Sequence, residues 1–311
     1  MKLPSDFIAT IQSVYREGGH AFLRALPDLI AEASKRWGLT DVRPVPMLSY
    51  NFVAFAKRAQ REVVLKMGVP NPEMKSEIAA LRLFDGEGAC KLLEYDEEKC
   101  WVLLERLDPG EMLVTLKDDE EATRIAAEVM KKIWRPMEAR GLPLEEQDPA
   151  HQKFILLSDW FDGLKRLRSM YSGGTGPLNE KLVERVERSV EVFFAEDHRP
   201  VLMHGDFHHY NILSSERGWL IIDPKGVIGP AGYEVGPLLI NPWGELINRR
   251  DIQKITKHRI DILHEHLGFE RKRIQEWGLA HAVLSSWWSI EDNTGWEYAA
   301  AFAEMIADLD I

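Results

Sequence analysis

One segment of the sequence, residues 201–226, concentrates polar side chains between two apolar runs and reads VLMHGDFHHYNILSSERGWLIIDPKG. Within it, Asp206 precedes Asn211 by five residues, and Asp223 follows Asn211 by twelve. Phosphoryl transfer needs a carboxylate that orients and deprotonates an acceptor hydroxyl, and oxygen ligands that hold Mg²⁺ against the phosphates. In this pattern Asp206 suits the role of the base, whereas Asn211 and Asp223 suit the metal.

The residues between Asn211 and Asp223 predict how these side chains could meet. They read as two short strands joined by a polar turn at residues 214–218, which is typical of a β-hairpin. Because a hairpin reverses the direction of the chain, we expect Asn211 and Asp223 to lie close together and near Asp206.

A second charged pair occurs in the first third of the chain. Lys66 is the lysine inside the strand-like run of residues 61–68, and Glu77 lies on the helix predicted over residues 72–84. Kinases pair a strand lysine with a helix glutamate to hold the phosphates of the nucleotide. A lone strand lysine is usually solvated, so the interpretation depends on the order of lysine, glutamate, aspartate, asparagine and aspartate along the chain.

The elements that must position these residues change character at Asp108-Pro109-Gly110. Before this break, apolar spacing predicts helices within residues 5–37, interrupted at Gly18-Gly19 and Pro27. A sheet follows, with the helix over residues 72–84 between its third and fourth strands. The strands are expected at residues 44–50, 52–58, 61–68, 89–96 and 99–107.

After this break the sequence is mainly helical, apart from the hairpin described above. We therefore expect an α+β, bilobal fold, with an antiparallel sheet and one key helix in the smaller N-terminal lobe. That lobe spans residues 1–104 and includes a helical extension over about residues 1–43. Residues 105–110 form the hinge, and residues 111–311 form a helical lobe with the catalytic loop and the acceptor site. The helices of this lobe are expected over residues 119–140, 151–195 and 247–311.

Composition places the chain among ordinary globular proteins and narrows its partners. Its 311 residues are 45% hydrophobic and 29% charged, and no apolar run approaches the roughly 18 residues that cross a bilayer. The net charge of −11 argues against a nucleic-acid surface, which needs basic patches. No signal-peptide apolar region is visible, and Cys90 and Cys100 imply no disulfide framework. We expect a cytoplasmic protein, monomeric or weakly dimeric, that binds neither membrane nor nucleic acid.

Several segments together carry a resemblance to a known family. The most specific is HGD-x-x-x-x-N at residues 204–211, followed by IDPK at residues 222–225. The chain resembles the aminoglycoside phosphotransferase superfamily of small-molecule kinases, and within it the streptomycin 6-phosphotransferase and hydroxyurea phosphotransferase branch. The supporting segments follow the family's order: VLKMG (64–68), SEIAALRLFDGEGACKLLEYD (76–96), WVLLERLDPGEML (101–113), WLIIDPKGVIGPAGYEVGPLL (219–239) and SSWWSIED (285–292).

The resemblance implies a protein-kinase-like fold, ATP and Mg²⁺ as nucleotide and metal, and a small-molecule hydroxyl as the acceptor. Asp206 would be the catalytic base, and His204 would shape the catalytic loop. Asn211 and Asp223 would hold Mg²⁺. The activity implied is the transfer of the γ-phosphoryl group of ATP to a hydroxyl.

The resemblance also assigns the nucleotide contacts. Lys66 would bind the α- and β-phosphates, steadied by Glu77. Backbone groups from Glu105 to Leu107 would bind adenine, and because backbone groups can serve either purine, GTP stays open beside ATP.

The chain departs from the family pattern in one place. A glycine-rich phosphate loop is expected between the first two strands, but this segment reads LSYNFVAF and contains no glycine. Ser49, Tyr50 and Asn51 are the candidates that would meet the phosphates instead.

Other interpretations of the polar segment predict different proteins. His204-x-Asp206 with a later histidine matches the two-His-one-carboxylate set of non-haem iron oxygenases, which would require an all-β jelly roll. Helices flank the segment here, and that interpretation leaves Asn211, Asp223 and Lys66 unexplained. A polar turn without function does not explain the ordered set either. A non-catalytic nucleotide-binding or regulatory relative would be expected to lose one of the three catalytic and metal-binding residues, and none is lost.

The acceptor is the least determined part of the prediction. A polycationic aminoglycoside such as streptomycin needs carboxylates near the catalytic base. The candidates are Asp159, Asp162, Glu234, Glu291 and Asp292. Asp159 and Glu291 lie close in sequence to Trp160 and Trp288, with which they could form a mixed stacking and ionic pocket. Each could equally be a solvated helix end or cap. Streptomycin, another aminoglycoside, hydroxyurea and an unrelated metabolite alcohol all stay open, so a role in antibiotic resistance is a hypothesis.

Overall fold

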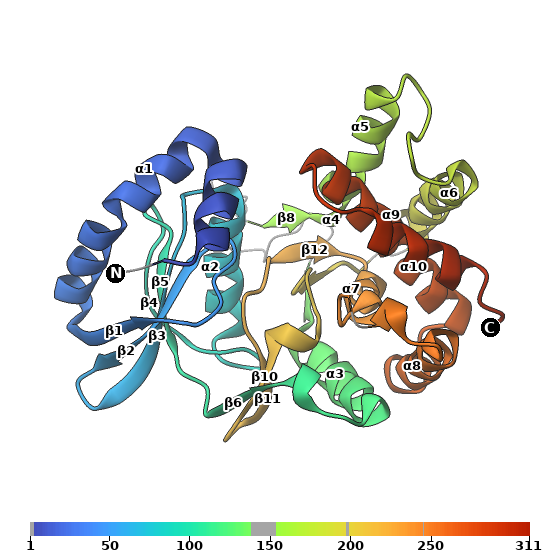
Figure 1. Ribbon diagram of the computed structural model, residues 1–311. Coiled ribbons are helices and arrows are strands. Elements are labelled where there is room, and N and C mark those ends of the chain that lie inside the picture. Colours follow the sequence, from blue (N-terminus) through green and yellow to red (C-terminus); the bar gives the residue numbers. More distant parts are fainter. Residues whose placement is uncertain (1–2, 138–153, 197–198, 245) are drawn as a thin grey trace.

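The computed structural model describes residues 3–137, 154–196, 199–244 and 246–311. Two lobes lie side by side, one built around a sheet and the other mainly of helices (Figure 1). The chain leaves the first lobe after strand β5, Trp101–Glu105, and enters the second at strand β6, Pro109–Met112. The crossing point therefore falls within residues 105–110, the segment for which the sequence predicts a hinge.

An antiparallel sheet forms the N-terminal lobe, from strands β1 Leu39–Pro44, β2 Phe52–Arg58, β3 Arg61–Met67, β4 Leu92–Asp96 and β5 Trp101–Glu105. Their spatial order is β1-β2-β3-β5-β4. Successive side chains of a strand point to opposite faces of a sheet. Leu65 and Leu103 accordingly pack in one apolar cluster, and Val64 and Leu104 pack in another.

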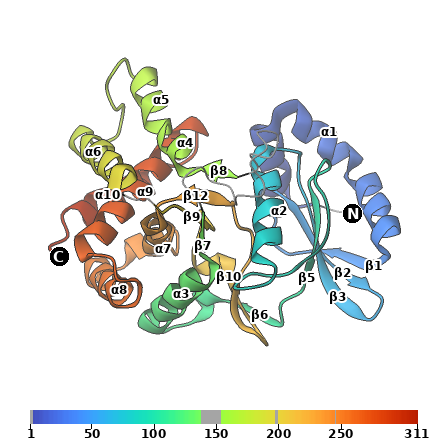
Figure 2. The same cartoon turned by 180° about the vertical axis from the view of Figure 1, so that it is seen from behind.

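One helix covers each face of this sheet. Helix α1, Ser5–Trp37, packs Phe7 into the first cluster, and helix α2, Pro72–Phe84, packs Leu81 into the second. Helix α2 lies on the side of the sheet that faces the C-terminal lobe (Figure 2). It begins as the sequence predicts, with a proline in its first turn and the side chain of Asn71 accepting the Met74 N–H at 3.0 Å.

The interruption expected in the first helix at Gly18-Gly19 lies two residues earlier, at Arg16, where φ is 48° and ψ is −122°. A Cβ at Gly19 would clash with the carbonyl of Ile11, so the backbone next to this kink requires a glycine. The interruption expected at Pro27 is wrong, because helix α1 continues through this residue. Phe22 and Leu26 pack against the sheet, and the helical extension ends at Trp37 rather than near residue 43.

The strand expected at residues 44–50 is also wrong, because the first strand is β1, Leu39–Pro44. Pro44 and Pro46 lack the N–H that a sheet ladder requires. Strand β1 lies at the edge of the sheet and buries only Leu39 fully, so its sequence LTDVRP lacks the alternating apolar pattern of a half-buried strand.

Helices make up most of the C-terminal lobe. They are α3 Asp119–Ile133, α4 Leu157–Phe161, α5 Gly163–Met170, α6 Glu180–Glu196, α7 Val235–Ile240, α8 Ile252–Leu267, α9 Arg271–Glu291 and α10 Glu297–Ala307. Helix α9 is the centre of this lobe, because it packs against α6, α7, α8 and α10 and buries Trp277 and Trp287 completely. Among the described residues, no helix has both the length and the apolar character of a membrane span.

Two small sheets lie where the lobes meet. In the first, β6 pairs with β10, Ile212–Ser215, and β10 forms the predicted hairpin with β11, Gly218–Ile221. The Cys90 N–H donates to the Ile221 carbonyl at 2.9 Å, which ties this hairpin to the N-terminal lobe. The second sheet contains β7 Arg135–Pro136, β8 Ile155–Leu156, β9 Val201–Met203 and β12 Val227–Gly229.

Candidate active site

A cleft of about 880 Å³ separates the two lobes, and Asp206 and Glu77 are among the described residues that line it. Lys66, Asn211 and Asp223 are not among these lining residues. The N-terminal lobe lines it with Tyr15 of α1, the loop before β2 and the start of α2. The C-terminal lobe contributes Asp206 after β9, Lys225 after β11 and the last turns of α9. Its described lining residues include Tyr50, Asn51, Asn71, Glu73, Glu77, Trp160, Gly205, His208, Asn241, Trp243, His281, Trp288, Glu291 and Asp292.

The loop after β9, which contains Asp206, is held in place by His204, which is completely buried. Its Nδ1 accepts the Asp206 N–H at 3.1 Å, so Nε2 carries the proton and donates to the Ile222 carbonyl at 2.9 Å. Burial lowers the pKa of this imidazole to about 4. His204 is therefore a neutral bridge between the loop after β9 and the end of β11, in agreement with the loop-shaping role that the resemblance implies.

Glu234 supports the same loop from the other side. Its Oε2 accepts the His204 N–H at 2.8 Å, and its Oε1 accepts the Gly205 N–H at 2.9 Å. Gly205 adopts φ 87°, and a Cβ at this position would come within 2.4 Å of Val227. Glu234 is fully buried and does not line the cleft, so the expectation that it contacts the acceptor is corrected: it positions the backbone of the loop.

The carboxylate of Asp206 points into the cleft, with its side chain 42% exposed. Its Oδ1 lies 3.5 Å from Nε2 of His208. Partial burial acts to raise the pKa of this carboxyl, but His208 and Lys225 outweigh burial and hold the pKa below its usual range. Asp206 is therefore ionised at neutral pH, as a group that orients and deprotonates a hydroxyl must be.

The β10–β11 hairpin brings Asn211 and Asp223 to the same place, as the sequence predicts. Ile212 pairs with Ile221, and the Ile222 N–H donates to the Asn211 carbonyl at 2.9 Å. The Nδ2 of Asn211 donates to the Asp206 carbonyl at 3.0 Å, which leaves its side-chain oxygen as a possible metal ligand. Asp223 has a positive φ of 59°, uncommon outside glycine and frequent at functional sites.

These two residues fit Mg²⁺ better than a transition metal. Mg²⁺ prefers hard oxygen ligands and is commonly held by one or two protein groups, with water and phosphate completing its shell. Across residues 3–137, 154–196, 199–244 and 246–311, no three His, Cys, Asp or Glu side chains gather as a metal site. The iron-oxygenase interpretation is wrong, because it requires such a set within an all-β fold.

The predicted pair of Lys66 and Glu77 is present at the floor of the interface between the lobes. The Lys66 Nζ lies 2.6 Å from both carboxylate oxygens of Glu77 and also contacts Asp223. Both members of the pair are buried. Burial raises the pKa of Glu77 to about 7 although Lys66 opposes this effect, and the two carboxylates keep the pKa of Lys66 above its ordinary value despite burial. The lysine is thus held as a cation beside Asp223.

The remaining nucleotide candidates lie at the edges of this arrangement. Asn51 lines the cleft, with its side-chain oxygen buried and unpaired, and Tyr50 lines it as well, whereas Ser49 does not. The carboxylate of Glu105 accepts the Lys91 N–H at 2.6 Å and pairs with Arg217. Leu107 is buried in the apolar cluster that contains Leu104 and Leu213.

Two acceptor candidates lie in different surroundings. Asp159 is exposed and is not among the described residues that line the cleft. Glu291 lines the cleft, but its carboxylate is held by Arg166 at 2.8 and 3.0 Å. Asp292, also a predicted candidate, lines the cleft directly, whereas Asp162 is exposed and is not among the described lining residues. Glu73 lines the cleft as well, although our sequence analysis does not name it as an acceptor contact. No sequence pattern indicates Glu73, because α2 is far in sequence from the other acceptor candidates.

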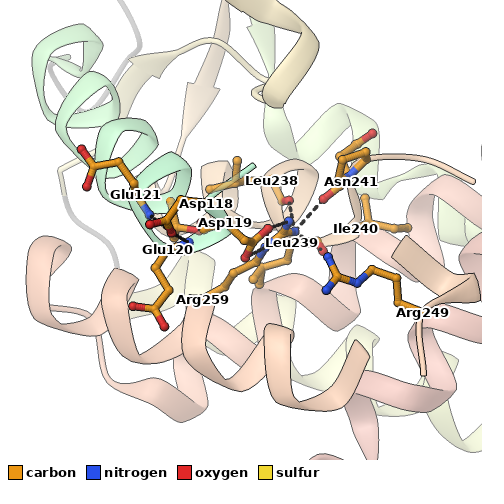
Figure 3. Close-up of polar contacts among 12 residues, drawn as sticks. Asp118, Asp119, Glu120, Glu121, Leu238, Leu239, Ile240, Asn241, Arg249 and Arg259 are labelled. Carbon is orange, nitrogen blue, oxygen red and sulfur yellow. Dashed lines mark hydrogen bonds and ion pairs between the residues drawn. The ribbon is translucent and has the colours of Figure 1, made fainter. Parts of the chain in front are cut away.

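One wall of the cleft is fixed by Arg259, which is almost completely buried in α8 (Figure 3). Its Nη1 donates to the Asn241 carbonyl at 2.6 Å and to the Leu238 carbonyl at 3.3 Å. Its Nε lies 3.0 Å from Oδ2 of Asp119. The carbonyls at the end of α7 are thus bound by a cation, which positions Asn241 at the edge of the cleft.

The two-lobed fold, with a lysine–glutamate pair in one lobe and an Asp-Asn-Asp set in the other, defines a phosphotransferase of the protein-kinase-like class. The fold is similar to that of aminoglycoside phosphotransferase APH(4)-Ia in its ternary complex with ADP and hygromycin B. The TM-score is 0.61 at 15% identity, covering 90% of this chain and 96% of that one. The prediction of a bilobal kinase-like fold is confirmed.

The sequence comparisons identify the family. The chain matches the aminoglycoside/hydroxyurea antibiotic resistance kinase family over residues 36–293 and belongs to it. It is 28% identical to streptomycin 6-kinase of Streptomyces glaucescens, over 94% of this chain and 92% of that protein. It is 29% identical to hydroxyurea phosphotransferase of Kitasatospora aureofaciens, over 94% of this chain and 81% of that protein. The resemblance inferred from the sequence is confirmed.

Proposed function

We propose that this protein transfers the γ-phosphoryl group of ATP to a hydroxyl of an aminoglycoside such as streptomycin. The observation that carries the proposal is the convergence of Asp206, Asn211, Asp223 and the Lys66–Glu77 pair on one interface between the lobes. The similarity to streptomycin 6-kinase supports the choice of acceptor. We further propose a cytoplasmic location, because the reaction consumes ATP and both cysteines are unbridged.

Each of these residues has a separate role in the proposed reaction. Lys66 binds the nucleotide phosphates, and the backbone between Glu105 and Leu107 meets the purine. Asp206 orients the acceptor hydroxyl and takes its proton on a carboxylate oxygen, while the hydroxyl oxygen attacks the γ-phosphorus and ADP leaves. His204 and Glu234 hold the loop that aims this carboxylate.

Asn211 and Asp223 are the residues that would hold Mg²⁺, which when bound neutralises charge on the phosphate oxygens. The contact from Lys66 fixes the Asp223 carboxylate beside the phosphate-binding position.

The walls of the cleft favour a large cationic acceptor. Trp160 and Trp288 form an edge-to-face pair with ring centroids 5.2 Å apart, and Tyr50 is half exposed opposite them. Burial, together with Glu291 and then Glu73, raises the pKa of Asp292, which shows that negative charge is crowded at this end of the cleft. Ammonium or guanidinium groups of an aminoglycoside would relieve that crowding and stack on the aromatic rings.

A small neutral acceptor is the alternative. Similarity to hydroxyurea phosphotransferase supports hydroxyurea, and an unrelated metabolite alcohol would use the same base. The aromatic and acidic residues that line the cleft favour the cationic acceptor over a small neutral one.

The first test measures acceptor-stimulated ADP release from ATP·Mg²⁺ with streptomycin, other aminoglycosides, hydroxyurea and simple amino-alcohols. We expect turnover with an aminoglycoside, a loss of at least about 10³-fold in Asp206→Ala, and nucleotide affinity within about threefold of wild type. Near-normal turnover in Asp206→Ala would contradict the assignment of the base. Release with hydroxyurea or an amino-alcohol alone would replace the aminoglycoside as acceptor.

A further inference from the structure

Lys225 occupies a position that the proposed mechanism does not yet use. Its backbone N–H donates to the His204 carbonyl at 2.7 Å, which joins the turn after Asp223 to the catalytic loop. Its side chain is 26% exposed and lines the cleft, with Nζ 3.7 Å from Oε2 of Glu73. The ammonium group therefore lies between the two lobes, where its charge also acts on the carboxylates of Asp206 and Asp223.

The charge balance of the cleft makes this lysine unusual. Among the described residues that line it, Lys225 is the only lysine or arginine. The acidic lining residues are Glu73, Glu77, Asp206, Glu291 and Asp292. A nucleotide triphosphate brings further negative charge into this cleft, so its terminal phosphate requires a cation. Lys66 is already engaged by Glu77 and Asp223 and is not among the described residues that line the cleft.

The loop between β1 and β2 offers little to offset the negative charge of the phosphates. Residues 45–51 read VPMLSYN, without the glycines that let successive backbone N–H groups converge on a phosphate. Tyr50 and Asn51 reach the cleft from this loop, but both side chains are neutral. A positively charged side chain for the terminal phosphate, in addition to Mg²⁺, must therefore come from another element.

We propose that Lys225 binds the γ-phosphoryl group and stabilises it during transfer, in place of the missing glycine-rich loop. This inference rests on the proposed kinase function. Lys225 exchanges its contact with Glu73 for equatorial oxygens of the phosphoryl group as the bond to ADP breaks and the bond to the acceptor oxygen forms. The acceptor proton goes to Asp206, and the lysine keeps its own protons throughout.

The test compares Lys225→Met and Lys225→Arg by steady-state kinetics and by calorimetric binding of ADP and a non-hydrolysable ATP analogue. For Lys225→Met we expect kcat to fall about 10²–10³-fold, as for the loss of one transition-state donor. Affinity for the ATP analogue should fall about tenfold, while affinity for ADP stays within about twofold, because ADP lacks the γ-phosphate. Lys225→Arg retains the charge, so its kcat should be at least about tenfold higher than that of Lys225→Met.

Lys75→Met is the matched control, since Lys75 is an exposed lysine on α2 outside the described cleft lining. It should change neither kinetics nor binding. A kcat of Lys225→Met within about threefold of wild type would overturn the proposal. Equal losses of ADP and ATP-analogue affinity, accompanied by a lower unfolding temperature, would assign Lys225 a purely structural role and overturn it as well.

The measurements of nucleotide binding distinguish a failure of this inference from a failure of the proposed function. If wild type turns over no acceptor but binds the ATP analogue, the loss of analogue affinity in Lys225→Met still supports the γ-phosphate contact, and its absence refutes it. If wild type binds neither nucleotide, the proposed kinase function fails, and the role of Lys225 fails with it.

Discussion

The carboxyl group of Glu234 lies fully buried beneath the catalytic loop, where it accepts the N–H groups of His204 and Gly205. Burial raises its pKa from 4.5 to about 8, although the two N–H groups act in the opposite direction. The folded chain therefore holds a proton on Glu234 more tightly than the unfolded chain does. The resulting stabilisation is fully present below pH 4.5 and is lost as the pH rises through about 8.

Replacing Glu234 by Gln removes this titration. It also places the side-chain NH₂ group next to one of the two backbone N–H donors, where neither group can accept a hydrogen bond. We expect the wild type to have the higher free energy of unfolding, most clearly near pH 5. The difference in unfolding free energy between the two proteins should narrow by up to about 1.4 kcal/mol per pH unit as the pH rises. Urea unfolding at pH 5.5, 6.5 and 7.5 measures this difference in the free energy of unfolding. Glu304→Gln, at an exposed position of α10, controls for the chemical change. A difference that widens with pH would contradict the buried-proton assignment.

At this scale the sequence identifies the residues whose order along the chain is specific, such as Asp206, Asn211 and Asp223. It misassigns Glu234 because a carboxylate is expected at the surface unless it is paired. Only the folded chain shows that two backbone N–H groups meet it. The environment of Lys225 is equally invisible, since Glu73 comes from a distant element.

The elements around the acceptor end of the cleft depend on one buried cation. Arg259 joins α8 to Asp119 at the start of α3 and to the carbonyls that end α7. The Asp119 side chain is 29% exposed, so removing Arg259 leaves mainly the buried carbonyls at the end of α7 without a donor. Each unsatisfied buried polar group costs about 1–3 kcal/mol. The end of α7 leads directly to Asn241 and Trp243, which line the cleft.

We therefore predict that Arg259→Met lowers the free energy of unfolding by about 3 kcal/mol and raises KM for the acceptor more than KM for ATP. Denaturant unfolding and two-substrate kinetics measure these effects. Arg249→Met provides the comparison, because Arg249 pairs with Asp251 at the surface and should cost less than about 1 kcal/mol. An Arg259→Met protein with the unfolding profile and acceptor KM of wild type would exclude this positioning role.

Elements with a regular pattern could be predicted, and elements governed by tertiary contacts could not. Helix α2 follows from a proline at its start and from apolar spacing, and the β10–β11 hairpin follows from a polar turn between two apolar runs. Strand β1 is an edge strand with one fully buried side chain, so its sequence contains little strand signal. The kink of α1 lies at Arg16, two residues before the glycines, and the close approach of Gly19 to the carbonyl of Ile11 shows why a glycine is needed beside it.

At the scale of the whole molecule, α2 connects the two lobes. Its Ser76 hydroxyl donates to the Gly226 carbonyl at 2.7 Å, and a Cβ at Gly226, where φ is 68°, would come within 2.6 Å of the Ser76 carbonyl. The contacts of Lys66 with Asp223 and of Glu73 with Lys225 join the same surfaces. Phosphates that enter here meet groups from both lobes, so nucleotide binding should stabilise the two lobes together.

Stabilisation of the fold by nucleotide and Mg²⁺ can therefore distinguish the proposed metal-binding residue from the proposed base. A non-hydrolysable ATP analogue with Mg²⁺, at about 100 times its Kd, should add about 2.7 kcal/mol to the free energy of unfolding and raise the Tm by about 5 °C. Chelating the metal should remove most of this shift in wild type, because triphosphate charge would then face Asp223 uncompensated.

Asp223→Ala should lose the dependence of the shift on Mg²⁺, whereas Asp206→Ala should keep it, because only the former residue holds the metal in the proposed site. Asp310→Ala, an exposed aspartate near the end of the chain, serves as the matched control. Thermal unfolding of the four proteins with the analogue, with and without a chelator, gives the comparison. An Asp223→Ala protein that responds to Mg²⁺ as the wild type does would place the metal on other ligands and remove Asp223 from the site.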